Sequence, residues 1–227
     1  LNTIGVDFIV TKKFDKNFSK TKATDFMKKI LSQKLNAKYI FVSNNFRFGN
    51  KREGDVDSLI KNEKIYKYKV VKPKPLFVNK RLVSSSLIRS FLEKGYLKKA
   101  NKLLNKKWSI VGKVQKGRQM GKKIGFPTCN IDIQDYVLAK PGVYAVKVLR
   151  KNNSKYLKGI ANLGYRPTFN QKKILLEVHL FNFSGNLYNK LLSVEFLKFI
   201  RKEKKFKNVN QLKAQIKTDL KIAKNTK

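Results

Sequence analysis

The stretch KILLEVHLFNF, residues 173–183, decides how the second half of this chain folds. Polar and apolar positions alternate in it, so that Glu177 and His179 share one face of a strand. The other face is apolar: Ile174, Leu176, Val178 and Leu180. A carboxylate amid apolar residues at a strand centre is costly unless it has a partner or a function. The pattern predicts a half-buried strand and marks Glu177 as a candidate functional residue. An exposed carboxylate on an edge strand is the alternative.

Other stretches of similar composition surround this strand. They are rich in β-branched and aromatic residues, as strands are: WSIVGKV (108–114), GVYAVKVLR (142–150) and KYLKGIANLG (155–164). Several short strands within about 90 residues predict a small antiparallel β-barrel. After them, one apolar stripe predicts a C-terminal helix that Asn208 can cap: Val209, Leu212, Ile216, Leu220 and Ala223.

The first half of the chain has a different texture. Predicted strands at 5–10, 37–43 and 66–71 alternate with predicted helices at 21–36, 55–62, 83–95 and 97–105. Strands that alternate with helices imply a parallel α/β sheet. The change of pattern at Lys106–Trp108 predicts two domains, residues 1–105 and 106–227, and a fold of class α/β plus β.

Composition limits the classes of function. The chain has 227 residues, of which 41% are hydrophobic, and no apolar run is long enough to span a membrane. The single cysteine, Cys129, and the lack of a secretion leader favour the cytoplasm. The net charge of +39 comes mostly from lysine rather than arginine, the better reader of bases and phosphates. We therefore expect no nucleic-acid or membrane partner, although a positive field attracts phosphorylated small molecules. A basic nucleic-acid-binding barrel is the alternative.

A glycine-rich loop, GKVQKGRQMGKKIGFPTCN (112–130), comes before the strand KILLEVHLFNF in the chain. Glycine lets a backbone approach a ligand closely, and exposed N–H groups can hold phosphate oxygens. The candidate residues for this role are Gly117, Gly121, Lys122, Gly125 and Pro127, with Lys113, Lys116, Arg118 and Lys123 as further countercharges. The loop is not a Walker A sequence.

Thr128 and Asn130 are separated by one residue, so a strand would place both side chains on one face. Their hydroxyl and amide oxygens suit a magnesium ion that takes its other ligands from water and ATP phosphates. The alternative is a hairpin loop in which Thr128 and Asn130 satisfy turn backbone.

Residues 121–130, GKKIGFPTCN, strongly resemble the G-x-x-x-G-[FIL]-P-T-A-N signature of riboflavin kinases, with Cys129 at the usual alanine. The resemblance implies that Thr128 and Asn130 hold the magnesium of MgATP and that the loop closes over the nucleotide. Residues 174–196 resemble the family's E-x-H-[LI]-x-x-F-x-x-x-L-Y segment. That likeness implies that Glu177 is the general base for the ribityl 5′-hydroxyl; we interpret His179 as mostly structural.

Two more segments match the kinase family. FIRKEKKFKNVNQLKAQIKTDL (199–220) is similar to its closing F-[IL]-R-x-E-x-x-F turn and helix, which implies a place for Arg201 near flavin and phosphates. Asn162 and Tyr165 match its N-[VIL]-G-x-x-P-T-[FV] loop, and Tyr188 its L-Y pair. Asn162 and Tyr188 are candidates for binding flavin or nucleotide; turn formation and core packing are the alternatives.

Residues 1–105 resemble the second half of an FMN adenylyltransferase module, a partial Rossmann-like nucleotidyltransferase domain. NNFRFGNKREGD (44–55) is similar to its G-x-[DN]-F-x-F-G loop, with Ser43 for the usual glycine and Asn45 at the matched amide. VSSSLIR is similar to its [IV]-S-S-[TS]-x-[IV]-R segment, in which serines at a helix N-terminus meet ATP phosphates. The matched residues are Ser84, Ser85, Ser86 and Arg89; plain N-capping is the alternative for the serines.

The chain is thus identified as a member of the bifunctional riboflavin kinase/FAD synthetase family, lacking its N-terminal portion. The resemblance implies an enzyme with Mg²⁺, ATP, riboflavin, FMN and FAD as cofactor, substrates and products. The family's adenylyltransferase uses an H-x-G-H segment, but the one histidine here is His179. We therefore expect FAD synthesis to be very weak. A flavin-binding remnant without turnover is the alternative function, and the oligomeric state is left open.

Overall fold

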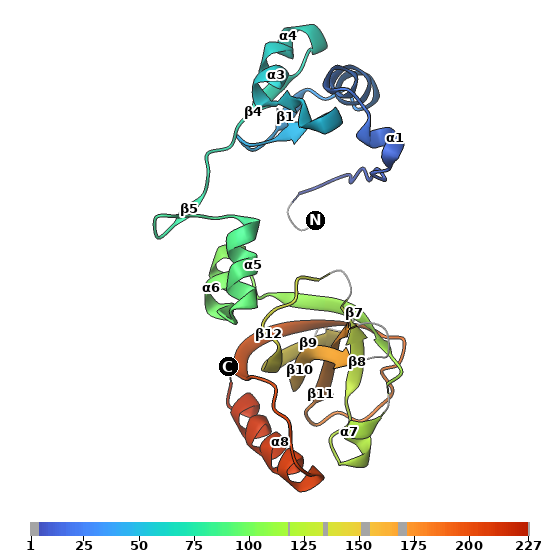
Figure 1. Ribbon diagram of the computed structural model, residues 1–227, viewed down its shortest axis with the longest axis vertical. Helices are drawn as coiled ribbons and strands as arrows, with labels where there is room; N and C mark the ends of the chain where they lie inside the picture. The colour runs from blue at the N-terminus through green and yellow to red at the C-terminus, as the bar shows by residue number, and fades with distance from the viewer. Residues whose placement is uncertain (1–4, 118, 134–135, 151–154, 168–171, 227) are drawn as a thin grey trace. The chain divides into compact units, whose positions relative to one another are not determined.

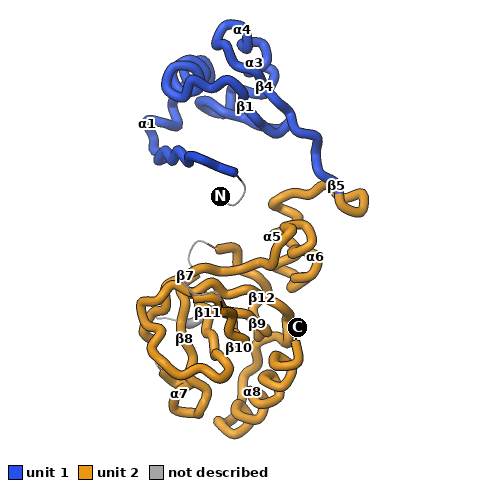
Figure 2. Tube along the Cα trace, turned by 180° about the vertical axis from the view of Figure 1, so that it is seen from behind, with its two compact units in different colours: residues 1–77 blue, residues 78–227 orange. Residues whose placement is uncertain are grey.

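The structure is a computed structural model that describes residues 5–117, 119–133, 136–150, 155–167 and 172–226. Side chains at 166–167 and 172–173 lie outside this description. The chain divides into two compact units, residues 1–77 and 78–227, which Figure 2 colours separately. Each unit has its own hydrophobic core and is described by itself.

The first unit is a small α/β unit around one parallel strand pair. Strand β1 (Tyr39–Phe41) pairs in parallel with β4 (Lys69–Val71), as the alternating pattern predicts. The connection carries the short strands β2 (Arg47–Phe48) and β3 (Gly54–Asp55), the turn η3 (Asn50–Arg52), and helices α3 (Val56–Lys61) and α4 (Glu63–Tyr66). Before β1 come α1 (Lys16–Ser19), α2 (Ala23–Asp25) and η2 (Phe26–Lys34), which has wide π-helical turns. The hydrophobic core of the first unit consists of Ala23, Met27, Ile40, Phe48, Leu59 and Tyr68.

The prediction of a strand at 5–10 is wrong. These residues form neither a helix nor a strand, and Phe8, Ile9 and Val10 are exposed. A β-strand is stable only when a neighbouring strand takes up its backbone hydrogen bonds. No strand pairs with this segment in the described part of the chain, so its composition alone does not make it a strand.

The second unit is a closed antiparallel barrel with the strand order β10-β11-β8-β7-β12-β9 (Figure 1). Its strands are β7 (Ser109–Gln115), β8 (Cys129–Asp132), β9 (Gly142–Arg150), β10 (Leu157–Pro167), β11 (Lys172–Leu180) and β12 (Leu191–Arg201). The short helix α7 (Met120–Lys123) lies in the loop between β7 and β8. Closure leaves the sheet without an unpaired edge. The predicted barrel is confirmed.

The barrel is filled by large apolar side chains. The rings of Trp108 and Phe196 lie 4.6 Å apart, and Tyr144 meets Phe196 edge-on at 5.0 Å. The C-terminal helix α8 (Val209–Lys224) covers one side of the barrel (Figure 1). Asn208 caps it by accepting a 3.0 Å hydrogen bond from the backbone N–H of Gln211, which confirms the predicted cap.

Helices α5 (Ser85–Glu93) and α6 (Leu97–Leu104) belong to the second unit, together with the hairpin strand β6 (Arg81–Leu82). The partner strand β5 (Phe77–Val78) straddles the division between the units. Leu92, Leu97 and Ala100 share one hydrophobic cluster with the barrel core. The backbone N–H of Lys140 also donates to Leu92 O at 2.9 Å. The compact units therefore divide earlier than residue 106, because the apolar faces of α5 and α6 pack against the barrel.

This packing predicts which unit α5 unfolds with. Leu92 is 3% exposed in the barrel cluster, and Leu59 is 0% exposed in the first unit. We expect Leu92→Ala to lower the free energy of unfolding of the barrel by about 2–5 kcal/mol. Urea unfolding followed by the fluorescence of Trp108 measures it, because Trp108 is the chain's one tryptophan and lies in the barrel.

Leu59→Ala is the matched control for this prediction. It removes the same atoms from the other core and should leave the Trp108 transition where it is. An unchanged transition in Leu92→Ala would show that α5 does not unfold with the barrel.

Candidate functional site

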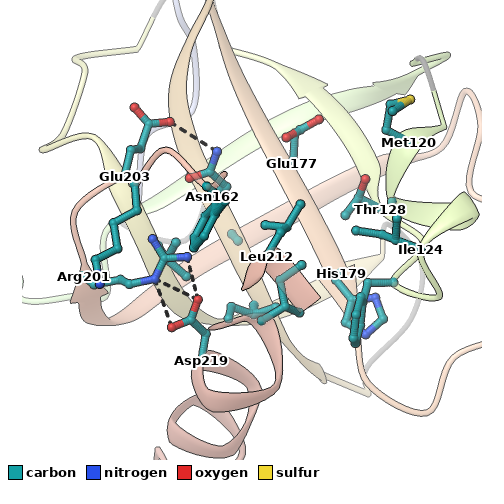
Figure 3. A pocket seen from close by; sticks show the side chains of 18 of the residues that line it. Met120, Ile124, Thr128, Asn162, Glu177, His179, Arg201, Glu203, Leu212 and Asp219 are labelled. Carbon is teal, nitrogen blue, oxygen red and sulfur yellow. Dashed lines mark hydrogen bonds and ion pairs between the residues drawn. The ribbon is translucent and has the colours of Figure 1, made fainter. Parts of the chain in front are cut away.

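Three cavities meet at Thr128 on the barrel. The first, of about 400 Å³, lies between the barrel and α8, with walls that include Ile124, Phe126, Leu212 and Ile216 (Figure 3). The second, of about 260 Å³, is lined by Asn130, Tyr165 and Gly164 among others. The third, of about 490 Å³, is lined by Lys122, Pro127, Cys129, Asn186 and Tyr188 among others. Thr128 lines all three cavities, and Glu177 lines the first two.

Strand register places three polar side chains in one row across the barrel. Asn130 on β8 is opposite Glu177 on β11, and Glu177 is opposite Asn162 on β10. Side chains at directly paired positions point to the same face of a sheet. Figure 3 shows Glu177 between Asn162 and Thr128. The structure therefore brings together Thr128, Asn130, Asn162 and Glu177.

The amide of Asn130 is buried, and its oxygen has no hydrogen-bond partner among the residues that the structure describes. The residue is 7% exposed, and its Oδ1 makes no hydrogen bond within the described residues. A buried acceptor without a partner costs about 1–3 kcal/mol. A bound cation would satisfy this oxygen, so the donor set fits a magnesium ion. No group of three His, Cys, Asp or Glu side chains that could hold a metal exists in the described part of the chain. A metal there would need water or substrate oxygens to complete its ligands, as Mg²⁺ commonly does.

Two glycines of the loop lie against these polar side chains. A Cβ added to Gly117 would stand 1.8 Å from Asn130 Nδ2, and one added to Gly121 would stand 2.3 Å from Phe126 O and 3.3 Å from Thr128 Oγ1. At Gly121 the obstructing atom belongs to the backbone, so only glycine fits there, whereas a side chain at Gly117 would have to displace the Asn130 amide. Gly125 has φ +89, a value that favours glycine in the turn before Pro127. Arg118 lies outside the described residues.

Arg201 lines the first cavity, but its guanidinium is engaged. Its Nε donates to both oxygens of Asp219 on α8 at 2.9 and 3.0 Å, and its second terminal nitrogen lies 2.7 Å from Asp219 Oδ2. Its remaining terminal nitrogen donates to Lys202 O at 2.9 Å. Asp219 is only 2% exposed and also accepts from Gln215 Nε2 at 2.9 Å. Arg201 therefore fastens α8 to β12 and shapes the cavity wall (Figure 3).

Sequence reasoning missed Asp219 and Glu203. Asp219 interrupts the apolar side of α8, and such a lone buried carboxylate signals a fixed cation nearby. Glu203 accepts a 3.3 Å hydrogen bond from Asn162 Nδ2, and a Cβ on Gly164 would stand 2.0 Å from its carboxylate. That close packing joins segments far apart in sequence, so strand and helix patterns do not predict it, although Glu203 is the glutamate of the matched F-[IL]-R-x-E-x-x-F turn.

Tyr188 lies in a different cavity from Asn162. Asn162 lines the first and second cavities, whereas Tyr188 lines the third, beside Lys122 and Pro127. The hydroxyl of Tyr188 accepts a 3.2 Å hydrogen bond from Gln119 Nε2. Tyr188 is thus grouped with the loop residues rather than with Asn162 and Arg201.

Cys129, at the position of the signature's alanine, behaves as a buried apolar residue. Its thiol donates to Val178 O at 3.4 Å, and burial raises its pKa to about 11. The thiol therefore stays protonated at neutral pH, and the thiolate that would act as nucleophile is scarce.

The residues matched to the adenylyltransferase lie in both units. Asn45 is in the first unit, where its Oδ1 accepts from Ser43 Oγ at 2.8 Å. Ser84 caps α5 by accepting a 3.2 Å hydrogen bond from Leu87 N, and Ser85, Ser86 and Arg89 lie within that helix. The structure thus places Ser84 in the capping role that was the alternative for it.

Two family models match this chain. The riboflavin kinase model matches residues 104–227, and the FAD synthetase model matches residues 1–87. The barrel with its three cavities is therefore a riboflavin kinase domain. Among the described residues, no helix is both long and apolar enough to cross a membrane.

Similar proteins carry both domains. The chain is 41% identical to the bifunctional riboflavin kinase/FMN adenylyltransferase of Buchnera aphidicola subsp. Schizaphis graminum, over 96% of this chain and 71% of the relative. It is 39% identical to the enzyme of that name from Haemophilus influenzae, with the same coverage. A crystal structure described as a macrolide-efflux protein from Streptococcus pneumoniae superposes with a TM-score of 0.77 at 28% identity, over 95% of this chain and 69% of that chain. This chain belongs to the bifunctional riboflavin kinase/FMN adenylyltransferase family, as its motifs predict.

The contact between Gly117 and Asn130 predicts a non-additive pair of substitutions. Gly117→Ala should lower the free energy of unfolding of the barrel by about 1–3 kcal/mol, because the new methyl group displaces the Asn130 side chain. In an Asn130→Ala background the same substitution should cost almost nothing, since the obstructing amide is gone. Urea unfolding of the parent, both single variants and the double variant measures the coupling. Equal costs in both backgrounds would contradict the contact.

Proposed function

We propose that this chain transfers the γ-phosphoryl group of ATP to the 5′-hydroxyl of riboflavin, giving FMN and ADP. The observation that carries the proposal is the position of Thr128 where three cavities meet, with Glu177 lining two of them. In a kinase the two substrates must meet beside the groups that position them and accept the proton, and this junction brings Thr128 and Glu177 together. Membership of the family supports the same reaction.

Each cavity suits one part of the two substrates. The first has the volume of a small-molecule site and apolar walls from Ile124, Phe126 and α8, which suit the flavin ring. The third brings Tyr188 beside Lys122 and Pro127, which suits the nucleoside of ATP. The second is lined by Asn130, Glu177 and Glu203, and would take the phosphates once a magnesium ion offsets the two carboxylates. Of the two roles predicted for Tyr188, flavin binding and nucleotide binding, this assignment proposes the second.

Thr128 and Asn130 would hold a magnesium ion through a hydroxyl and an amide oxygen. The Oδ1 of Asn130, which has no hydrogen-bond partner in the described part of the chain, supports this role. When bound, the ion neutralises charge on the phosphate oxygens of ATP. Gly117 and Gly121 keep the loop close enough to frame both side chains.

Glu177 is the proposed general base. The ribityl 5′-oxygen forms a bond to the γ-phosphorus, the bond from that phosphorus to the bridging oxygen of ADP breaks, and Glu177 accepts the hydroxyl proton. The carboxylate is held on a strand between Asn130 and Asn162, so its position is fixed by sheet register rather than by a loop. Arg201 acts by holding α8 against the cavity.

The second activity of the family is proposed to be weak in this chain. We keep residues 1–105 as the functional adenylyltransferase domain, because they include all the matched nucleotide residues: Asn45, Ser84, Ser85, Ser86 and Arg89. Helix α5 belongs to this domain by function, although it packs with the barrel. The one histidine is His179, which lies on β11 of the barrel. The segments of this sequence that match the adenylyltransferase contain no histidine. The reducing cytoplasm is the proposed location, because the single Cys129 cannot form an internal disulfide.

Flavin chromatography tests both activities in one experiment. After incubation with riboflavin, ATP and magnesium, we expect FMN with almost no FAD. Comparable amounts of FAD would contradict the predicted weakness of the second step. Binding of riboflavin without release of ADP would show that the chain is a flavin-binding remnant without turnover. Affinity for nucleic acid that falls steeply with salt would favour the basic nucleic-acid-binding barrel.

Glu177→Gln tests the base. The amide keeps the size of the side chain but cannot accept the proton, so the rate of FMN formation should fall by about 10²–10⁴-fold. Binding of riboflavin and of ADP, measured by calorimetry, should change little. Turnover within a few-fold of the parent would show that Glu177 is not the general base.

A further inference from the structure

His179 is a polar residue that lines the first cavity, and the reaction above gives it no part. It lies on β11 two positions beyond Glu177, on the same face of the strand. Its ring extends toward the loop that leads into β8, where its Nδ1 lies 2.8 Å from Pro127 O. A carbonyl oxygen only accepts hydrogen bonds, so Nδ1 carries the proton in this contact.

The contact holds the peptide that leads into Thr128. Pairing between β11 and β8 ends at Val178 and Cys129, one residue short of Thr128. The preceding turn is closed by the hydrogen bond from Phe126 N to Gly121 O at 2.8 Å. Pro127 lies between these two fixed points. The His179 side chain therefore links the strand that carries Glu177 to the peptide plane between Pro127 and Thr128.

Aromatic neighbours fix the orientation of the imidazole. Phe126 meets it edge-on with ring centroids 6.1 Å apart, and Phe181 lies at the same centroid distance, tilted by 60°. A ring packed between two others has few rotamers open to it, so its N–H keeps its direction. Figure 3 shows His179 beside Thr128 and Ile124 at this end of the cavity.

We propose that His179 is a positioning residue for the magnesium site: through Nδ1–H and Pro127 O it sets where the Thr128 hydroxyl lies relative to Asn130 and Glu177. This inference deepens the proposed function and rests on Thr128 as a magnesium ligand. Residues that orient metal ligands typically change metal affinity by 10–100-fold when they are replaced. A wall residue of the cavity would instead change riboflavin affinity, and a purely structural residue would change only the stability of the fold.

Two substitutions of His179 separate these roles. In Asn the amide nitrogen stands at the same number of bonds from Cβ as Nδ1 does, so His179→Asn can keep the bond to Pro127 O. In Gln the nitrogen is one bond further out, which corresponds to Nε2, so His179→Gln cannot keep it in the same geometry. Tyr156→Phe is the matched control, because it removes one exposed hydrogen bond of the barrel, from Tyr156 to Glu195, away from the residues lining the three cavities.

The readout is binding rather than turnover. Calorimetry gives the Kd of ADP in EDTA and in magnesium, and the ratio of the two measures how strongly the metal promotes binding. We expect the ratio in His179→Gln to fall by about tenfold or more, and the ratios in His179→Asn and Tyr156→Phe to stay within about threefold of the parent. The Kd of riboflavin should change little in every variant.

Equal ratios in His179→Gln and His179→Asn would overturn the inference, as would a loss of riboflavin affinity with an unchanged ratio. If His179→Gln does not fold, His179→Ser is read in the same way, since its hydroxyl cannot reach the carbonyl. A parent chain whose ADP binding does not depend on magnesium would overturn the metal assignment of the proposed function, and this inference with it. The two failures are therefore distinguishable.

Discussion

The pairing of β8 with β11 is the constraint on which the rest of the site depends. It places Asn130 opposite Glu177, and the pairing of β11 with β10 adds Asn162 to the same row. A shift of one residue would turn every one of these side chains to the other face and bury Glu177 in the apolar core. Barrel closure prevents such a shift, because each strand is held on both sides. The alternation of KILLEVHLFNF and the closed sheet thus specify the same register.

The glycine loop follows from this register. With Asn130 buried beside Glu177, the segment that covers the amide has no room for a side chain at Gly117. Pro127 and the turn at Gly121 then direct the chain into β8 with Thr128 at the junction of the cavities. The loop residues are therefore specified by the close approach of backbone to polar side chains, and the charge of the neighbouring lysines is a separate, long-range contribution to binding anions.

Local patterns of the sequence predicted the barrel strands, the Asn208 cap and a common face for Thr128 and Asn130, because period and capping are properties of short segments. The link between these two residues and Glu177 came from the resemblance to riboflavin kinases. What they could not predict depends on partners distant in sequence. Residues 5–10 have strand composition but no paired neighbour in the described chain, and α5 and α6 follow an α/β pattern yet pack against the barrel. The burial of Asp219 against Arg201, and the place of Tyr188 in the third cavity, likewise depend on tertiary packing.

The Arg201–Asp219 pair shows how this chain separates holding from chemistry. Three short contacts from the guanidinium neutralise the buried carboxylate of Asp219, and the remaining nitrogen donates to Lys202 O. Because Arg201 is ion-paired with Asp219, it stabilises α8 as a cavity wall. It can bind a phosphate only weakly unless this ion pair first breaks. In the proposed reaction, positive charge for the phosphates would then come from the lysines of the loop and from a magnesium ion at Thr128 and Asn130. In the proposed reaction, Glu177 therefore lies between the α8 wall of the first cavity, where riboflavin would bind, and the loop that would bind ATP.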